Sequence, residues 1–230
     1  MAATTASRGG AASEARVNRF LAQVYAIMTL GLLVTALVST WLSRDLMRLL
    51  NIASSPWLVF GLFLVQIMLV VALSRSVQTM KAGAAFLIFL AYAALTGVTL
   101  STIFLYYSND LIYQVFWITA ATFLITSVVA MVMKLDMSKA GPILFMLLLG
   151  WIIAWTFTIF FPSGPVSNGL NFIGIALFVG LTAWDTQRLK KLGEQLDTHP
   201  ARNGLAVVGA LMLYLDFINL FLLILRASRR

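Results

Sequence analysis

LYLDFINLFLLILR, Leu213–Arg226, is apolar enough to lie in a lipid bilayer but carries an aspartate, Asp216, near its centre. Such a stretch predicts a membrane-spanning helix, because about 20 apolar residues cross the ~30 Å of hydrocarbon in a bilayer. A carboxylate in the middle of a span costs at least about 2.5–3.5 kcal/mol on insertion scales. Asp216 therefore needs a partner or a function that offsets this cost.

The rest of the chain shares this apolar character. Of its 230 residues, 61% are hydrophobic and 10% are charged, whereas soluble domains carry roughly 25% charged residues. The composition predicts a protein with several spans whose main partner is the lipid bilayer. The net charge of +8 comes from basic residues between apolar segments, which indicates topology and anionic lipid rather than nucleic acid.

Seven apolar segments approach the length of a span, and the gaps between them carry turn or charge signals. None of the segments alternates as barrel strands do. We therefore predict an all-α bundle of seven transmembrane helices within residues 17–230 and a disordered, cytoplasmic tail over the small and polar residues 1–16. The predicted spans are about 20–42, 56–74, 84–106, 111–133, 141–161, 170–187 and 205–225.

Basic residues orient the bundle. Most flank the ends on the N-terminal side, which the positive-inside rule places in the cytoplasm: Arg8, Arg16, Arg19, Arg75, Lys81, Lys134, Lys139, Arg188, Lys190, Lys191 and Arg202. The opposite side has Arg44 and Arg48, together with the C-terminal Arg226, Arg229 and Arg230 if the last segment spans. That basic C-terminus leaves two alternatives: seven full spans, which we favour, or a last segment that re-enters and leaves both termini cytoplasmic.

Asp185 and Asp216 are the two acidic residues that lie within predicted spans. Asp216 is about 11 residues into its segment, or roughly 17 Å deep, which is near the midplane. Asn219 shares its helical face, so the two form a polar stripe that must face the interior of the bundle. A structural hydrogen bond between helices explains Asp216 without further function, but a midplane acid more often marks a proton or ion path.

Asp185 lies three residues before Arg188, and an ion pair between them at the membrane surface also explains it without function. Arg75 ends the second segment at the same side, where a snorkelling arginine is the usual interpretation. If Arg75 instead faces the bundle beside Asp185, it would hold that carboxylate ionised. Gln66 lies on the same predicted span as Arg75, and we expect its side chain to make a hydrogen bond that packs this span against a neighbour.

Enzyme motifs are absent from the sequence. It contains no H-E-x-x-H, no G-x-S-x-G and no phosphate loop. With no cysteine and a single histidine, His199, thiolate and histidine metal clusters are excluded. An intramembrane aspartyl protease would use two acids, but neither Asp185 nor Asp216 is followed by the glycine of presenilin-like proteases. We predict a protein that is not an enzyme and has no cofactor.

Two stretches, IALFVGLTAWDTQRLKK (175–191) and ALMLYLDFINLFLLILR (210–226), closely resemble the last two helices of the Bax inhibitor-1 family, also called the transmembrane Bax inhibitor motif family. LTGVTLSTIFLYY (95–107) and DMSKAGPILFMLLLGWIIA (136–154) also fit that family. The resemblance covers roughly residues 20–226. It implies a seven-helix fold with the last helix at the centre, and a pH-sensitive leak of calcium or other cations.

The resemblance also implies roles for particular residues: Asp185 and Asp216 as the pH sensor and gate, and Arg75 as a latch that pairs with Asp185. Two carboxylates in low-dielectric surroundings cannot both ionise cheaply, so they would share a proton that bonds the two helices. Calcium would be the permeant ion, with a transient site near the pair. The sequence departs from relatives at Trp184, where many have tyrosine, and at Gln66, where some are expected to have glutamate; this weakens any calcium site in the second segment.

One difficulty concerns depth. If Arg188 lies at the surface, Asp185 is only about 5 Å into the membrane, so it meets Asp216 only if the sixth segment sits deeper or the seventh tilts. Two other functions stay open. A regulator of a membrane protease or stress pathway needs its tail and a partner but not the aspartates, and a proton-coupled transporter is the third possibility. For all three we expect a bacterial inner-membrane location with a cytoplasmic N-terminus.

Overall fold

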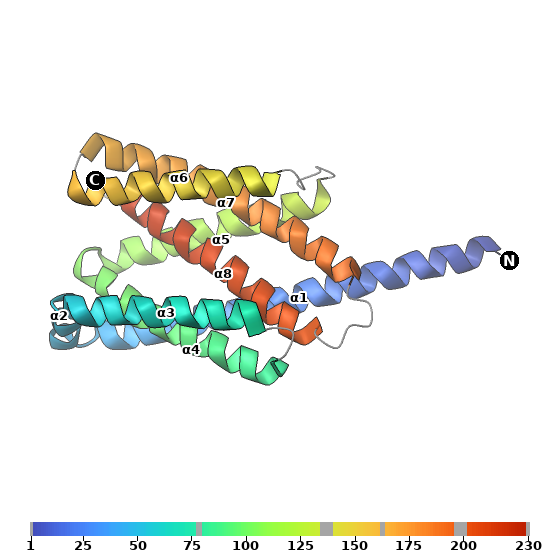
Figure 1. Ribbon diagram of the computed structural model, residues 1–230, viewed down its shortest axis with the longest axis horizontal. Helices are drawn as coiled ribbons and strands as arrows, with labels where there is room; N and C mark the ends of the chain where they lie inside the picture. The colour runs from blue at the N-terminus through green and yellow to red at the C-terminus, as the bar shows by residue number, and fades with distance from the viewer. Residues whose placement is uncertain (1, 77–79, 134–139, 162–163, 196–201, 229–230) are drawn as a thin grey trace. The chain divides into compact units, whose positions relative to one another are not determined.

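The computed structural model describes residues 2–76, 80–133, 140–161, 164–195 and 202–228, without the side chains of residues 2–13, Ser76 and Ile159. Over these ranges the chain forms helices and no strand (Figure 1). In this part of the chain, seven helices are long and apolar enough to cross a membrane, so the predicted all-α bundle is confirmed.

The elements are α1 (Ala2–Ser43), α2 (Leu46–Ala53), α3 (Pro56–Ser76), α4 (Ala82–Ser101), the 3₁₀ helix η1 (Thr102–Leu105), α5 (Asn109–Val132), α6 (Ala140–Phe160), α7 (Gly164–Gln195) and α8 (Arg202–Ala227).

The helix ends differ from the sequence-based prediction in three places. Residues 2–16, for which the composition predicts disorder, are helical in α1; alanine, which recurs there, has the highest helix propensity of any residue. α7 continues to Gln195, well past the predicted end at 187, because Leu189 and Gly193 are buried rather than released to solvent. The short helix α2 was not predicted; Asp45 caps its first turn by accepting from the N–H groups of Met47 and Arg48.

The described residues divide into two compact units. The first unit comprises Met1–Ser108 and Leu192–Tyr214. Within it α4 packs against α1 and α3, and α2 contacts α1, α3 and η1. Gly97 permits the close approach of α4 to α1, since a Cβ there would lie 2.8 Å from the backbone oxygen of Thr35 and 2.8 Å from Cβ of Val38. A small residue at this position thus lets the two helix backbones approach closely.

Tyr214 is the largest fully buried side chain of the first unit. Its ring makes edge-on contacts with Phe89 and Tyr92 of α4, at centroid distances of 5.6 and 5.9 Å. The hydroxyl of Thr35 donates to the backbone oxygen of Ala93 (2.8 Å), so the Tyr214 hydroxyl donates to Thr35 Oγ1 (2.6 Å). This chain of hydrogen bonds satisfies the only polar atom of a tyrosine that is otherwise packed among apolar groups.

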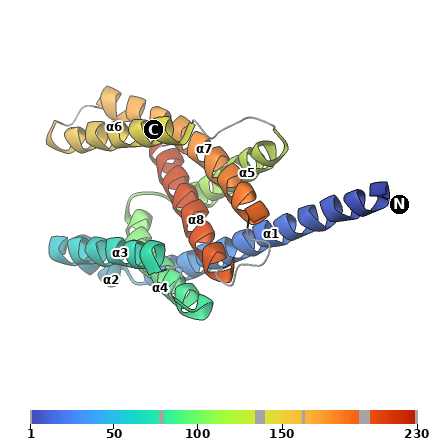
Figure 2. The same ribbon diagram turned by 45° about the vertical axis from the view of Figure 1, so that its right-hand side comes forward.

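The second unit comprises Asn109–Lys191 and Leu215–Arg230. α6 lies alongside α7 in both ribbon views (Figures 1 and 2), and a Cβ on Gly180 of α7 would lie 3.2 Å from Leu144 of α6. The apolar core joins α7 to the end of α8, with α6 packed against it. Its buried members are Leu177, Phe178, Leu181, Leu220 and Leu223.

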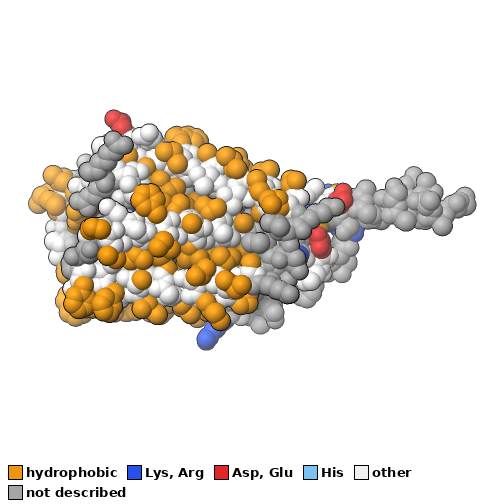
Figure 3. Space-filling model, turned by 90° about the horizontal axis from the view of Figure 1, so that it is seen from above, with side chains coloured by type: hydrophobic (Ala, Val, Ile, Leu, Met, Phe, Trp, Pro, Cys, Tyr) orange, Lys and Arg blue, Asp and Glu red, His pale blue; other side chains and the backbone are white. Residues whose placement is uncertain are grey.

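Hydrophobic side chains cover much of the face seen in the space-filling view (Figure 3). Large apolar residues such as Leu37, Phe63, Leu124 and Ile153 are exposed on four different spans. An apolar surface of this extent suits lipid tails rather than water. By contrast α8 is the most buried of the candidate spans, and it contributes residues to both units.

Candidate functional site: a buried carboxyl pair

Asp185 of α7 and Asp216 of α8 lie together in the second unit. Their side chains are buried, with exposed fractions of 8% and 6%, and the two carboxyl groups are within hydrogen-bonding reach of each other. The two carboxyl groups meet in spite of the difference in depth that the sequence predicts. α7 extends to Gln195, seven residues beyond Arg188. Asp185 is therefore about 15 Å from the end of its helix, and not close to a helix end at Arg188.

The contact between the two carboxyl groups needs a proton. Asp185 Oδ1 and Asp216 Oδ2 are buried and have no hydrogen-bond partner among the described residues. An ionised carboxylate only accepts hydrogen bonds, whereas a protonated one donates. A proton on one carboxyl group therefore supplies the donor that turns this contact from a repulsion into a hydrogen bond.

The surroundings of the pair are apolar or already satisfied. Phe217, next to Asp216 in the chain, packs edge-on against Phe116 and Phe123 of α5, at centroid distances of 5.7 and 5.6 Å. The nearby hydroxyl of Thr182 donates to the backbone oxygen of Phe178 at 2.8 Å. Low-dielectric surroundings of this kind strengthen electrostatic interactions and make two adjacent negative charges costly.

Arg188 lies one helical turn beyond Asp185, as the spacing predicts, and is close enough to act on its charge. Its guanidinium, however, lies over the indole ring of Trp184, 5.2 Å from the centroid. The Trp184 ring in turn packs against Gly141 of α6, where a Cβ would overlap it. A cation–π contact therefore holds Arg188 on the face of Trp184.

Gln187 and Lys190 are two residues near the pair that the sequence did not identify. The amide of Gln187 donates to the backbone oxygens of Ala130 (3.1 Å) and Met133 (3.5 Å), and Lys190 Nζ donates to Met131 O (3.0 Å). These are the carbonyl groups that the end of α5 leaves without partners inside its own helix. Side chains of α7 within about one and a half turns after Asp185 thus cap α5 and fix the register of the two helices.

The remaining predicted site residues lie elsewhere. Arg75 is exposed at the end of α3 in the first unit, whereas Asp185 belongs to the second, so the latch stays a prediction. Gln66 of α3 donates to the hydroxyls of Thr96 (3.2 Å) and Thr99 (3.4 Å) on α4, which is a packing contact. Asn219 is half-buried on α8, three residues from Asp216.

The described residues contain no group of three or more histidine, cysteine or acidic side chains that could hold a metal ion. Calcium takes six to eight oxygen ligands, more than two carboxyl groups supply. A calcium ion near Asp185 and Asp216, which stays a prediction, would therefore take its remaining ligands from water or from other oxygen atoms. His199, Asp197 and Asp136 lie outside the described residues.

Comparison with known proteins places these observations in a family. Residues 17–228 match the family described as "Inhibitor of apoptosis-promoting Bax1". The chain is 40% identical over 215 residues to inner membrane protein YbhL of Escherichia coli K12, which covers 93% of this chain and 92% of that protein. It is 40% identical over 210 residues to an uncharacterized protein of Borreliella burgdorferi (91% and 90% covered). It is also 34% identical over 222 residues to an uncharacterized membrane protein of Streptococcus pyogenes (95% of each).

Proposed function

The chain belongs to the Bax inhibitor-1 family of membrane proteins, and from this premise we propose that it is a pH-sensitive leak channel for calcium or other cations. The gate is the carboxyl pair Asp185 and Asp216, which shares one proton. Its place is the bacterial inner membrane, with the N-terminus in the cytoplasm. The similarity to an Escherichia coli inner membrane protein and the seven apolar helices of the described chain support that location.

One observation carries the proposal: two buried carboxyl groups lie within hydrogen-bonding reach, and each has an oxygen with no other partner in the described chain. If the pair served only to tie α7 to α8, two amides would do so at any pH without the cost of burying acids. Acids in place of amides make the contact depend on a proton. Titration is therefore the property that distinguishes this pair from a plain packing contact.

The physical consequence of losing the proton is large enough to move helices. With one proton the pair forms a charge-assisted hydrogen bond between α7 and α8. Without it, two unit charges about 4 Å apart repel by about 4 kcal/mol at an effective dielectric constant near 20. An interhelical hydrogen bond in a membrane contributes only about 1–2 kcal/mol. A rise in pH that removes the shared proton therefore favours separation of the two helices at this point.

Calcium flux into liposomes that contain only the purified chain tests the proposal. We expect flux that changes with pH when both sides of the membrane are held at the same pH, because a leak channel needs no proton gradient. Flux that appears only with a proton gradient, and stops when a protonophore collapses it, would indicate a proton-coupled transporter. A chain that carries no calcium under either condition would favour the regulator of a membrane protease or stress pathway.

A further inference from the structure

α2 is an eight-residue helix between two candidate spans. Only Arg44 and Asp45 separate it from the end of α1, and only Ser54 and Ser55 separate it from the start of α3. Because both neighbours cross the membrane, these short connections keep α2 at the level where the two spans leave the hydrocarbon. α2 therefore lies at the boundary between lipid and water, where each of its faces can meet protein, lipid or water.

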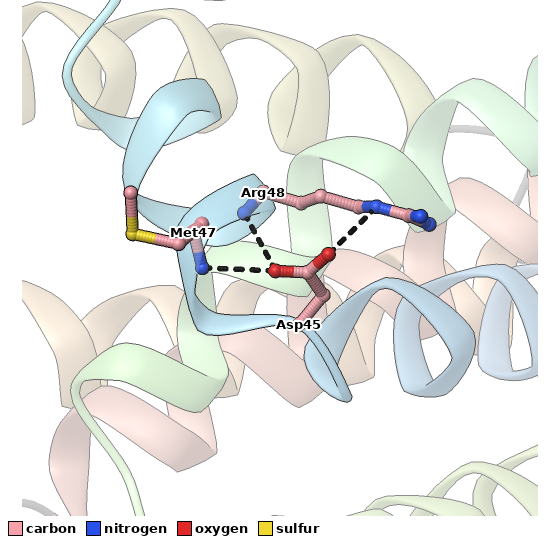
Figure 4. Close-up of polar contacts among 3 residues, drawn as sticks. All are labelled: Asp45, Met47 and Arg48. Carbon is pink, nitrogen blue, oxygen red and sulfur yellow. Dashed lines mark hydrogen bonds and ion pairs between the residues drawn. The ribbon is translucent and has the colours of Figure 1, made fainter.

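The carboxylate of Asp45 caps the N-terminus of α2 (Figure 4). Asp45 Oδ1 accepts from the N–H groups of Met47 (3.0 Å) and Arg48 (3.2 Å), while Oδ2 pairs with Arg48 Nε at 2.9 Å. The guanidinium of Arg48 also lies 5.1 Å from the centroid of the Trp41 ring, in the last turn of α1. Free N–H groups are costly near a bilayer, and this arrangement satisfies two of them while it ties α2 to α1.

α2 has three faces rather than two. Leu49 is buried, with 2% of its side chain exposed, and faces the neighbouring helices. Met47, Leu46 and Leu50 are exposed on the adjoining faces, Met47 to 68%. Arg48 and Asn51 form a narrow polar edge. A surface helix of a soluble protein exposes mainly polar residues, whereas here three large apolar residues beside the buried face are exposed.

We propose that α2 is a membrane-interface helix, whose face of Leu46, Met47 and Leu50 is buried in the acyl–headgroup boundary of the bilayer. The edge of Arg48 and Asn51 points to water and to lipid phosphates. Interfacial helices combine an apolar face of this kind with a basic edge. The proposal goes beyond the leak activity and does not depend on it, because it concerns the first unit and none of the carboxyl pair.

The aromatic residues beside α2 support lipid as the occupant. Trp41 is exposed in the last turn of α1 and Trp57 in the first turn of α3. Tryptophan is enriched at the level of the headgroups, where its ring is partly buried and its N–H stays near water. The two tryptophan rings thus place α2 at the level of the lipid headgroups. At this level its apolar face lies beside the lipid-facing surfaces of α1 and α3.

A second copy of the chain is a poorer occupant. An eight-residue helix is only about 12 Å long, and stable protein interfaces bury about 800 Å² on each partner. Three side chains on so short an element fall well below that area. Bilayer insertion needs no such minimum, since each buried apolar group contributes on its own.

Site-directed spin labelling tests the orientation, because the chain has no cysteine and single-cysteine variants need no background changes. Met47→Cys and Leu50→Cys place a label on the apolar face, and Asn51→Cys is the matched control on the polar edge. All three positions are exposed, so the labels should not disturb folding. The full chain is reconstituted at low protein-to-lipid ratio, and collisions with oxygen, which concentrates in lipid, are compared with those of a water-soluble nickel complex.

We expect labels at 47 and 50 to collide more with oxygen than with nickel, and the label at 51 to show the reverse. Three results would overturn the proposal. Access of nickel to all three labels would place α2 in water. Protection of 47 and 50 from both reagents would show that protein covers the face. Preference for oxygen at all three positions would place the whole helix in hydrocarbon rather than at the interface.

Discussion

The side-chain amide of Gln187 on α7 donates to carbonyl groups at the end of a different helix, α5. Ala130 O lies in the last turn of α5 and Met133 O directly follows the helix, where carbonyl groups have no partner within the helix, and Gln187 donates to both. Asp185 lies two residues earlier on the same helix, α7. The contact of Gln187 with α5 therefore helps to set the position of α7, and with it the position of Asp185 relative to α8. In a membrane, a carbonyl group left without a donor has no water to replace it.

Replacement of Gln187 by leucine should therefore destabilise the chain. We expect a loss of about 1 kcal/mol or somewhat more in the free energy of unfolding, the usual effect of one lost hydrogen bond with its acceptor left buried. Gln195→Leu is the matched control, because Gln195 is exposed at the end of the same helix. Unfolding in mixed micelles measures both. Equal effects of the two changes would show that the capping contact contributes nothing.

Arg75 offers a second prediction at this scale, one that depends on the proposed latch. If Arg75 pairs with Asp185 in one state of the gate, Arg75→Ala removes a charge that favours the ionised carboxylate. The pH at which calcium flux changes should then rise, because the shared proton is held up to higher pH. Lys81→Ala, which removes an exposed basic residue at the start of α4, is the control. The same flux–pH curve for wild type and Arg75→Ala would leave Arg75 as a surface anchor.

At the scale of helices, close packing of α4 on α1 depends on one position without a side chain. A Cβ at Gly97 would meet the Thr35 backbone and Val38 at 2.8 Å, a distance that backbone atoms cannot relieve without moving the helix. Gly61 of α3 has nothing within 4 Å of the corresponding point. The two glycines therefore differ in what they do, although they look alike in the sequence.

Alanine substitutions should separate them. Gly97→Ala should destabilise the chain by about 1–3 kcal/mol, as overpacking does in other cores. Gly61→Ala should be neutral or stabilise by up to about 1 kcal/mol, because alanine favours the helix and meets no neighbour. Thermal unfolding in detergent reports both. A Gly97→Ala variant as stable as wild type would mean that the α1–α4 contact is looser than the structure has it.

The sequence predicted some elements much better than others, for physical reasons. The ends of the predicted spans 56–74 and 141–161 fall within two residues of the observed ends of α3 and α6, because turn residues bound a uniformly apolar run. α2 was missed because its pattern extends over only eight residues, and the end of α7 was missed because charged residues there are read as loop. Asp185 and Asp216 were found because they are the two acidic residues within predicted spans, and the family motifs around them then indicated their role. Gln187 was not, since its partners are backbone atoms on a helix distant in sequence.

At the scale of the whole chain, the basic residues and the length of α8 bear on topology. α8 has 26 residues, or about 39 Å, which is enough to cross the hydrocarbon even when tilted. This length favours seven full spans over a re-entrant last segment. The opposing feature is its basic end, where Arg226 lies 4.6 Å from the centroid of the Trp155 ring of α6. A cation–π contact of that kind holds a charged helix end near the interface on either side of the membrane.

Topology reporters should decide between the two arrangements. Fusions at the N-terminus and within residues 188–204 should read cytoplasmic, because most basic residues flank that side. Fusions within residues 162–169 and at the C-terminus should read periplasmic. A cytoplasmic C-terminal fusion, with the other three as expected, would contradict seven full spans and show that the last segment re-enters.

The most direct test of the central claim compares Asp216→Asn with Asp216→Ala in the liposome calcium assay. Asparagine keeps the shape of the side chain and donates an N–H to Asp185 at every pH, but it cannot titrate. If the shared proton is the gate, Asp216→Asn should fold and insert normally yet give a flux that no longer changes with pH. Asp185→Asn should behave alike, and the double variant should add little because coupled groups act together. An Asp216→Asn protein that keeps the pH response of the wild type, with only Asp216→Ala losing stability, would contradict the claim and leave the pair as a tie between helices.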